Sequence, residues 1–358
     1  MKRIPLHLLA FLFIISCTKQ HAPRTIESIE IQEFQMKGTS IRAINAVDEN
    51  SVFYAGSKGD VGFKTDHGTT LTAMNIKYQD SIIPHFRSVA FNGSAYFALS
   101  VENPALLYKI SDGESKLVYK EEHKKVFYDA MQFFDDNVHG IAVGDPTDTC
   151  ASIILTANGG ETWQKISCDN LPKFEEGEAF FAASNTNIKT LGSTVWIASG
   201  GTKARILKSD DFGATWQIFN TPIIQGNGPQ GIYSIDFADA TNGIIIGGDY
   251  SKPLENKANK AITKDGGSTW TLIADNQNPN YKSCVQYVPN TNGKEVFAVG
   301  KTGISFSNDG GATWKEVSKE GYYAIDFVDE HTAWLSGNEK IGKLVLPKMI
   351  WLGGTLKI

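Results

Sequence analysis

The sequence predicts an all-β protein, a seven-bladed β-propeller built from four-stranded antiparallel blades. A short glycine-containing motif recurs every 44 to 54 residues, a repeat length typical of propellers and solenoids. Each repeat holds four short runs of alternating apolar residues separated by glycine turns, as at 233–237 and 243–247. A lone N-terminal run, residues 26–34, has no partner of its own and can complete the last blade. We therefore expect one propeller domain at 26–350 and a C-terminal tail at 351–358.

The composition agrees with a soluble, glycine-rich β protein. Of 358 residues, 41% are apolar, 20% are charged and 34 are glycine, which excludes disordered, collagen-like and polytopic membrane proteins. The formal net charge of −5 argues against a nucleic-acid partner, because phosphate binding needs a concentrated basic face. Four cysteines are too few for a disulfide-framework scaffold. Composition alone leaves the function open.

The first residues have the pattern of an export signal. Lys2 and Arg3 precede an apolar run at 8–15, which is too short to span a bilayer. The run ends in Ile-Ile-Ser-Cys17, which resembles a bacterial lipobox. That resemblance implies cleavage before Cys17, lipid on its sulfur, a signal peptide at 1–16 and a lipid-anchored tether at 17–25. The alternative is an ordinary signal peptide that contains a cysteine. Since no acidic residue follows Cys17 directly, we expect an outer-membrane anchor facing the periplasm.

The recurring motif combines an acidic or amide residue, a glycine and a tryptophan at fixed offsets. Four copies end at a tryptophan, namely TANGGETW, SDDFGATW, TKDGGSTW and SNDGGATW. A fifth copy, KTDHGTTL, ends at Leu71, and a sixth retains only Asp112. In a hairpin turn, aspartate accepts local backbone N–H bonds, glycine allows a positive φ, and tryptophan packs between sheets. The residues given this structural role are Asp66, Asp211, Asp265, Asp309, Trp163, Trp216, Trp270 and Trp314.

These motifs resemble the Asp-box (BNR) repeats, whose pattern is Ser/Thr-x-Asp-x-Gly-x-Thr-Trp. Three copies match fully, and one has Asn158 in place of the aspartate. The resemblance covers nearly all of residues 38–346 and implies a propeller in which the boxes are structural. After Trp314 the chain continues with three further runs, at 322–328, 332–337 and 340–346. Residues 26–34 would close the ring as the fourth strand of that blade, giving seven blades. Six or eight blades remain alternatives.

The cysteines suggest one disulfide and no metal site. Cys150 and Cys168 flank the third box symmetrically, so they would lie opposite each other on paired strands. An exported compartment permits their oxidation, and the alternative is two reduced, packed thiols. Cys284 would remain unpaired and buried. No Cys-x-x-Cys motif or cluster of histidine and cysteine suggests a metal, so we expect no cofactor.

The candidate binding surface is the face opposite the boxes. Long insertions at 169–179, 220–231 and 249–257 all fall there, and function concentrates on loops held by a rigid scaffold. The innermost strands also begin at this face. Their aligned first positions are Arg42, Arg87, Asp129, Phe180, Tyr233, Ser283 and Tyr323. The planar guanidinium of arginine can bind a carboxylate through two hydrogen bonds. The acidic residues expected at the rim are Glu178, Asp145, Asp148 and Asp249. The alternative is a polar channel mouth that binds only water.

Two enzyme families within the superfamily offer a competing function. Sialidases bind a carboxylate with three arginines, the first in an Arg-Ile-Pro motif. Here Arg-Ile-Pro occurs only at residues 3–5, inside the signal, and no arginine follows Arg205, which argues against a sialidase site. Xyloglucanase-like propellers use paired aspartates, and isolated acids neither establish nor exclude that geometry. A glycan-acting hydrolase is therefore the alternative function.

The amino-acid pattern within the blades most resembles the photosystem II assembly and stability factor family, as it occurs in non-photosynthetic bacteria. The matching segments are YSIDFADATNG at 233–243, with Gly247-Gly248, and YAIDFVD at 323–329. In that family an arginine patch binds a membrane-protein client without catalysis, and only Arg42 and Arg87 represent the patch here. No glycine-rich dinucleotide loop supports a redox function. We expect a monomeric, lipid-anchored scaffold for a protein or glycan of the cell envelope.

Overall fold

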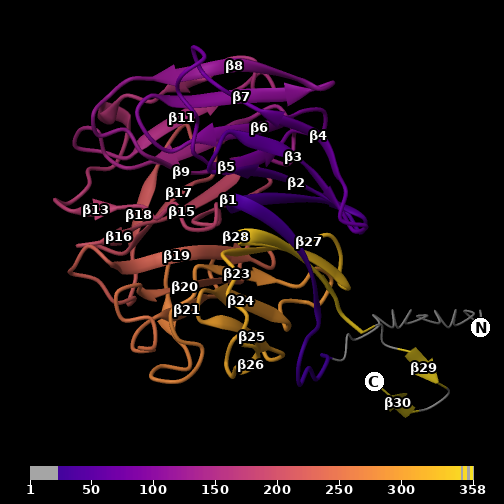
Figure 1. Ribbon diagram of the computed structural model, residues 1–358. Helices are drawn as coiled ribbons and strands as arrows, with labels where there is room; N and C mark the ends of the chain where they lie inside the picture. Colours follow the sequence, from indigo (N-terminus) through magenta and orange to yellow (C-terminus); the bar gives the residue numbers. More distant parts are fainter. Residues whose placement is uncertain (1–22, 348–349, 353–354, 358) are drawn as a thin grey trace, which may run out of the picture.

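The computed structural model describes residues 23–347, 350–352 and 355–357. The strands between residues 31 and 345 form a ring of antiparallel sheets around a central axis, and the two short C-terminal segments lie outside the ring (Figure 1). The signal segment and Cys17 lie outside the described residues. Three four-stranded sheets are each built from consecutive strands. The first holds β5 (Phe86–Phe91), β6 (Tyr96–Ser100), β7 (Ala105–Ser111) and β8 (Glu114–Glu121). The second holds β9 (Tyr128–Phe133), β10 (Gly140–Gly144), β11 (Ser152–Thr156) and β12 (Gln164–Lys165). The third holds β23 (Cys284–Tyr287), β24 (Val296–Gly300), β25 (Gly303–Ser307) and β26 (Lys315–Ser318).

A fourth four-stranded sheet and one enlarged sheet follow the cysteine pair. The four-stranded sheet holds β14 (Ile188–Leu191), β15 (Thr194–Ala198), β17 (Arg205–Ser209) and β18 (Gln217–Asn220). The enlarged sheet holds β19 (Gln230–Phe237), β20 (Gly243–Asp249), β21 (Lys260–Thr263) and β22 (Thr271–Leu272), extended by the short strands β13 (Glu178–Ala179) and β16 (Gly200–Gly201). A 3-10 helix, η1 (Cys168–Asn170), and a C-terminal hairpin, β29 (Ile350–Leu352) with β30 (Thr355–Lys357), complete the elements.

The expected count of seven blades is wrong, because the described strands form six sheets of four or more strands. One of the two six-stranded sheets contains β27 (Ala324–Phe327), β28 (Thr332–Val345), β1 (Ile31–Asp48), β2 (Ser51–Gly56), β3 (Asp60–Thr65) and β4 (Thr70–Asn75). The sequence suggested two separate blades here. Instead β1 is one long strand whose first half pairs with β28 and whose second half pairs with β2, so both chain ends share one sheet.

Side chains of the innermost strands link several of these strands to the next one around the axis. A carboxylate or amide near the end of one strand accepts a hydrogen bond from a backbone N–H of the following innermost strand. The acceptor and donor pairs are Gln132 with Thr190 at 2.8 Å, Asp236 with Tyr287 at 2.7 Å, Gln286 with Phe327 at 3.0 Å, and Asp326 with Ala46 at 2.7 Å. Aromatic clusters such as Phe97, Phe133 and Trp163 fill the space between sheets.

The boxes form hairpin turns with a repeated hydrogen-bond pattern. In the box ending at Trp270, the Asp265 carboxylate accepts bonds from the Thr269 N–H at 2.9 Å and hydroxyl at 2.6 Å. The Trp270 indole N–H donates to the Gly267 carbonyl at 3.0 Å. The boxes at Asp211 and Asp309 repeat this pattern. Asp66, whose box lacks the tryptophan, instead pairs with Lys343 of β28 at 3.1 Å.

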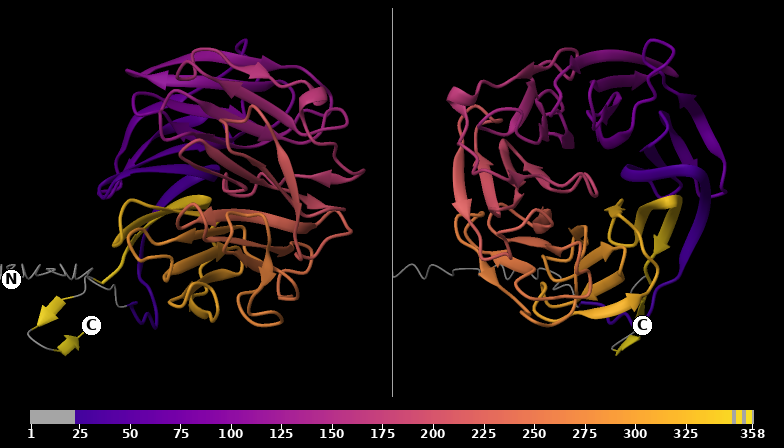
Figure 2. Two further views of the ribbon diagram at one scale, coloured as in Figure 1. Left: turned by 180° about the vertical axis from the view of Figure 1, so that it is seen from behind. Right: turned by 60° about the vertical axis from the view of Figure 1, so that its left-hand side comes forward.

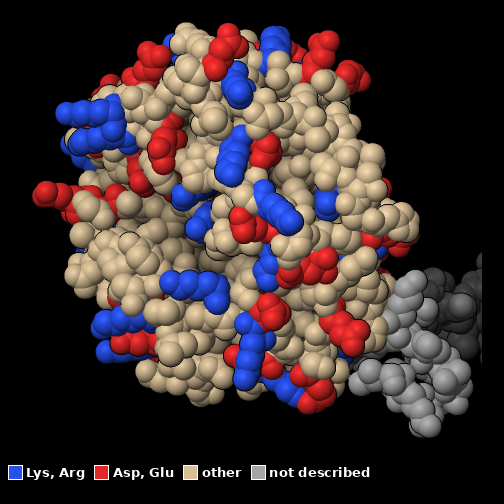
Figure 3. Space-filling model, viewed as in Figure 1, with Lys and Arg blue, Asp and Glu red and all other residues tan. Residues whose placement is uncertain are grey.

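The ring has two faces, which differ in the turns that they carry. The box face carries the box turns and the turns between the first and second strands of each blade. The loop face carries the remaining connections, including the long insertions. The right-hand view of Figure 2 looks onto the ring from the side of β13 and β16, which belong to the loop face. Acidic and basic side chains are interspersed over the side of the molecule seen in Figure 3.

Candidate functional site

Residues 180–187 pass through the centre of the ring and close it. The Asn185 side-chain amide donates to the Val89 carbonyl at 2.8 Å and accepts from the Met131 N–H at 2.9 Å. On the other side, the Ile235 N–H donates to the Thr186 carbonyl at 2.8 Å. These bonds join β5, β9 and β19 across the axis. We call residues 180–187 the plug.

Phe180, one of the predicted ring residues, belongs to the plug and not to an innermost strand. The sequence alignment placed Phe180 at the start of an innermost strand, but that strand is β14 and begins at Ile188. Phe180 reaches the axis from the inserted segment instead. Asn185 has a positive φ of 64°, a conformation that asparagine tolerates better than most residues. Small side chains at Ala182, Ala183 and Ser184 let the backbone fit inside the ring.

A cavity of about 560 Å³ opens above the plug on the loop face, within the size range of ligand pockets. We call it the cup. The residues that line it are Arg42, Arg87, Phe127, Phe180, Phe181, Ala182, Ala183, Tyr233, Tyr250, Tyr281, Ser283, Lys301 and Tyr323. The structure thus brings together six of the seven predicted ring residues, and no described Asp or Glu is among the residues that line the cup.

Aromatic rings make the wall of the cup rigid. Phe181 stacks on Tyr233 with ring centroids 3.9 Å apart, and Tyr281 meets Tyr233 edge-on at 4.9 Å. The Tyr233 hydroxyl donates to the Pro229 carbonyl at 2.8 Å. Burial raises the pKa of Tyr233 far above its ordinary value, so its hydroxyl stays neutral. Such amphipathic rings offer large contact area with little conformational freedom to lose.

The two arginines of the cup contact carbonyl oxygens, a histidine and an aromatic ring. The Arg42 guanidinium lies 4.0 Å from the Tyr323 ring centroid, and its Nη1 donates to the Ala183 carbonyl at 3.4 Å. Arg87 donates from Nη1 to the Ala182 carbonyl at 3.5 Å and from Nε to His85 at 3.4 Å. Among the described residues, neither guanidinium has a carboxylate within ion-pair distance. Burial, and then the positive charge of Arg42, lower the pKa of Arg87. An anion in the cup would relieve that repulsion.

Asp129, another predicted ring residue, is fully buried behind the cup wall and does not line it. Burial first, and then the neighbouring Asp145, raise its pKa well above the ordinary value. Burial also raises the pKa of Asp145 to about 6, although the Phe180 N–H donates to its carboxylate at 2.7 Å. Asp129 and Glu102 both act to raise the pKa of Arg87, but burial and the charge of Arg42 outweigh them.

Glu178 was predicted on the binding face, but the structure places it inside the protein. Its carboxylate forms an ion pair with Arg205, whose Nε lies 2.9 Å away, and accepts a bond from the Ser199 hydroxyl at 2.7 Å. Asp249 accepts bonds from Ser251 at 2.9 and 2.5 Å. The pair of Glu178 and Arg205 therefore holds the insertion that leads into the plug. Sequence reasoning missed it because the two residues lie 27 positions apart.

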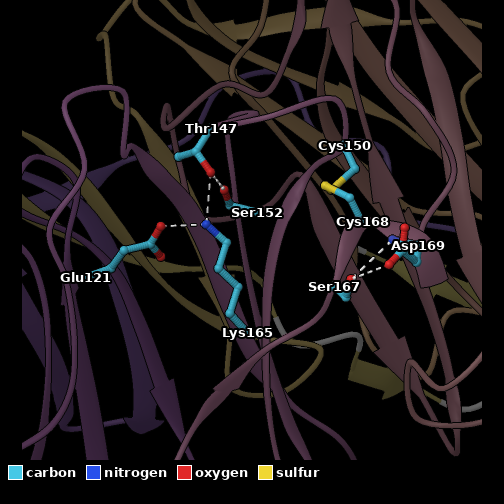
Figure 4. The surroundings of a disulfide bond; sticks show 8 residues. All are labelled: Glu121, Thr147, Cys150, Ser152, Lys165, Ser167, Cys168 and Asp169. Atoms are coloured by element: carbon cyan, nitrogen blue, oxygen red, sulfur yellow. Dashed lines mark hydrogen bonds and ion pairs between the residues drawn. A yellow bond between two sulfur atoms is a disulfide. The ribbon is translucent and has the colours of Figure 1, made fainter.

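The disulfide joins Cys150 to Cys168 at the base of the same insertion, with Cα atoms 5.5 Å apart (Figure 4). In Figure 4, Lys165 lies near the bridge and forms an ion pair with Glu121. The remaining described cysteine, Cys284, is buried and unpaired. The bridge and the Glu178–Arg205 pair both restrain the chain that enters the ring as the plug.

Several residues of the cup were not anticipated from the sequence. Phe127 and Tyr281 each lie two positions before a predicted ring residue, so a second tier of the same alignment would have identified them. Tyr250 comes from the insertion at 249–257, and its side chain is 48% exposed. Lys301 donates to the Tyr250 carbonyl at 3.1 Å from the neighbouring blade. Nothing local in the sequence marks that contact.

The described residues include neither a metal cluster nor a membrane-spanning helix. Its described residues contain no group of three or more His, Cys, Asp or Glu side chains placed to hold a metal ion. No helix among the described residues has the length and apolar character needed to cross a membrane.

Comparison with solved structures places the chain among β-propellers. A structure described as YCF48 bound to D1 peptide matches 92% of this chain and all of its own chain, with a TM-score of 0.65 and 14% identity. The WD40 repeats of RRP9 match 91% of this chain with a TM-score of 0.64, and U3-55K matches 90% with 0.63, each at 10% identity over its full chain. These identities establish the fold alone. No family model and no curated protein matches the chain.

Proposed function

We propose that this chain is an exported, lipid-anchored and non-catalytic binding module whose cup binds a carboxylate-bearing segment of a cell-envelope protein. The observation that carries the proposal is the pair of guanidiniums, Arg42 and Arg87, which face an aromatic cup without acidic partners. A planar guanidinium donates two parallel hydrogen bonds to a carboxylate, and the surrounding aromatic rings exclude water and so strengthen these bonds. The peptide-bound YCF48 structure is a precedent for a propeller that binds a protein segment.

The plug supports binding of a protruding segment instead of a threaded chain. Its hydrogen bonds to Val89, Met131 and Ile235 close the channel below the cup. A partner therefore enters and leaves by the same opening on the loop face. We further propose that the module is a monomer, and that the signal at 1–16 and Cys17 place it at the outer membrane facing the periplasm.

A cross-linked pulldown from native membranes tests the proposal. The wild type is compared with an Arg42→Ala/Arg87→Ala variant, and a Lys264→Ala/Lys294→Ala variant serves as the control because it removes two positive charges from the box face. We expect the wild type and the control to capture the same dominant protein, and the cup variant to lose at least nine-tenths of it. Identical capture by all three proteins would falsify the role of the cup.

A glycan-acting hydrolase is the second candidate. The observation in its favour is the neighbouring pair Asp129 and Asp145, whose pKa values burial raises, as an acid catalyst requires. Against it, neither carboxyl is among the residues that line the cup. A glycan-cleavage screen with the wild type and an Asp145→Asn variant separates the two functions. Cleavage that the variant abolishes would replace the binding proposal with the enzymatic one.

A further inference from the structure

The first described residues of the chain are fixed to the box face. Arg24 is 3% exposed, and its backbone N–H and its Nε each donate to the Glu295 carboxylate at 2.7 Å. Its Nη1 donates to the Glu330 carbonyl at 2.6 Å, and the Asn308 amide donates to the Arg24 carbonyl at 3.0 Å. Residues 24 and 25 were expected to belong to a free tether. Arg24 is instead part of the folded body.

All three partners of Arg24 belong to box-face turns. Glu295 ends the turn before β24, Glu330 lies in the turn between β27 and β28, and Asn308 belongs to the box that ends at Trp314. The cup opens at the other end of the innermost strands. In Figure 1 the first described residues and the end of β28 leave on the right, whereas β13 and β16 stand at the left. The chain thus emerges from the face opposite the cup.

The tether is too short to reverse this arrangement. If Cys17 carries the lipid, seven Cα–Cα steps separate it from Arg24, and they span at most about 25 Å when fully extended. The innermost strand β19 has eight residues, which correspond to about 23 Å between the two faces. A path from Arg24 to the rim of the cup must cover this height and must also pass around the outside of a blade several strands wide, so a fully extended tether cannot carry the lipid there.

The charges of the box face disfavour adsorption onto an anionic lipid surface. The acidic side chains in its turns are Glu49, Asp66, Asp112, Asp135, Asp136, Glu161, Asp210, Asp211, Asp239, Asp265, Glu295, Asp309, Asp329 and Glu330. The lysines in the same turns are Lys264 and Lys294. Four lysines of the adjoining strands reach these turns and form ion pairs with Glu161, Asp210 and Asp66, namely Lys109, Lys116, Lys208 and Lys343. Surfaces that adsorb to anionic lipid carry clustered Lys and Arg instead. The body is therefore held near the bilayer by its tether alone.

From these contacts we infer that the propeller stands with its box face toward the anchoring membrane and presents the cup to the aqueous space. The inference rests on the lipid anchor in the proposed function. It narrows the partner of the cup to an envelope protein whose binding segment projects clear of the anchoring bilayer. Lipid headgroups of that bilayer and segments lying flat on it are out of reach of the cup.

Energy transfer from the protein to a membrane dye tests this orientation. The lipidated full-length protein is placed in vesicles of phosphatidylethanolamine and phosphatidylglycerol that contain a headgroup-labelled acceptor. A donor dye is attached either at Ser268→Cys in a box or at Leu254→Cys on the loop face. Both side chains are exposed and belong to one blade. The native cysteines do not compete for the dye, because Cys150 and Cys168 are bridged, Cys284 is buried, and the Cys17 sulfur carries the lipid in the lipidated protein.

We expect energy transfer from residue 268 to exceed that from residue 254 at least threefold. A variant with twenty Gly and Ser residues inserted before Pro23 is the matched control, and it should lose most of the difference. Equal transfer from the two positions, or a difference that survives the long tether, would overturn the orientation. Mass spectrometry of the N-terminal peptide distinguishes a failure of the proposed lipid anchor from a failure of the inferred orientation. An unmodified Cys17 refutes the anchor and the orientation together, whereas a lipidated protein with equal transfer leaves the proposed anchor and cup intact.

Discussion

The box face and the region behind the cup hold their carboxylates in opposite ways. Asp265 in a box turn is exposed and accepts three hydrogen bonds, from Thr263 and Thr269, and the bonds from Thr269 contribute most to lowering its pKa to about 2. Behind the cup wall, burial raises the pKa of Asp145 to about 6. The first carboxylate stabilises a turn when it is charged, and the second opposes folding when it is charged.

The arginines of the two faces also differ, because, among the described residues, the one on the box face is paired with a carboxylate and those in the cup are not. On the box face, the Arg24 guanidinium pairs with Glu295 and donates to the Glu330 carbonyl. On the loop face, the contacts that Arg42 and Arg87 make with the described residues are to carbonyls, a histidine and aromatic rings. The contrast separates groups that complete the fold from groups left available for a ligand. Substitutions on the box face should therefore cost stability, whereas those in the cup should cost binding.

The largest effect is expected from breaking the pair of Arg24 and Glu295. An Arg24→Ala substitution leaves the buried Glu295 carboxylate without its arginine, which typically costs about 3–5 kcal/mol. Urea unfolding followed by tryptophan fluorescence measures the loss. An Arg24→Ala/Glu295→Gln variant should recover part of it, because no buried charge remains. A single variant as stable as the wild type would show that the N-terminal segment is not fixed to the box face.

Removal of the disulfide comes next. Cys150→Ser/Cys168→Ser opens a loop of 18 residues, and such a bridge contributes about 3 kcal/mol to the free energy of unfolding. The loss should appear in urea unfolding of the oxidised wild type against the variant. A Cys284→Ser variant controls for loss of a thiol. If the cysteine variant also binds its partner more weakly, the bridge positions the plug and cup as well as stabilising the fold.

How far the sequence predicts the fold depends on how local each feature is. The boxes at Asp211, Asp265 and Asp309 were predicted correctly as turns, because each hydrogen bond spans at most four residues. The four-stranded blade also follows from local alternation and glycine turns. The number of sheets does not, because it depends on β1 pairing with β28 across nearly the whole chain.

The site shows the same division. Arg42, Arg87, Tyr233 and Tyr323 line one cavity because equivalent positions of repeated strands share one register. The insertion at 169–187 has no counterpart in the other repeats, so alignment there misplaced Phe180. It also assigned Glu178 to the surface, since its partner Arg205 follows only after β14 and β15. An insertion breaks the periodicity on which the alignment depends.

The pH dependence of stability should differ in sign between the two regions. Asp145 has a folded-state pKa of about 6 against an ordinary value of 3.8, so the native state binds the proton more tightly. Relative to Asp145→Asn, the wild type should gain about 2 kcal/mol as the pH falls from 7 to 4. Thermal unfolding across that range measures the gain. Asp148→Asn, at an exposed position of the same loop, should show no such trend.

Asp265 should give the smaller and opposite response. Asp265→Ala removes three hydrogen bonds to a carboxylate in an exposed turn, and we expect a loss of about 1–2 kcal/mol at pH 7. Because the folded pKa is about 2, the contribution is fully present above the ordinary value of 3.8 and is lost as the pH falls through 2. Lys264→Ala in the same turn should change stability by less than about 0.5 kcal/mol. If the difference between wild type and Asp265→Ala grew on acidification, the box carboxylates would not be stabilising in their charged form, and the contrast between the two regions would fail.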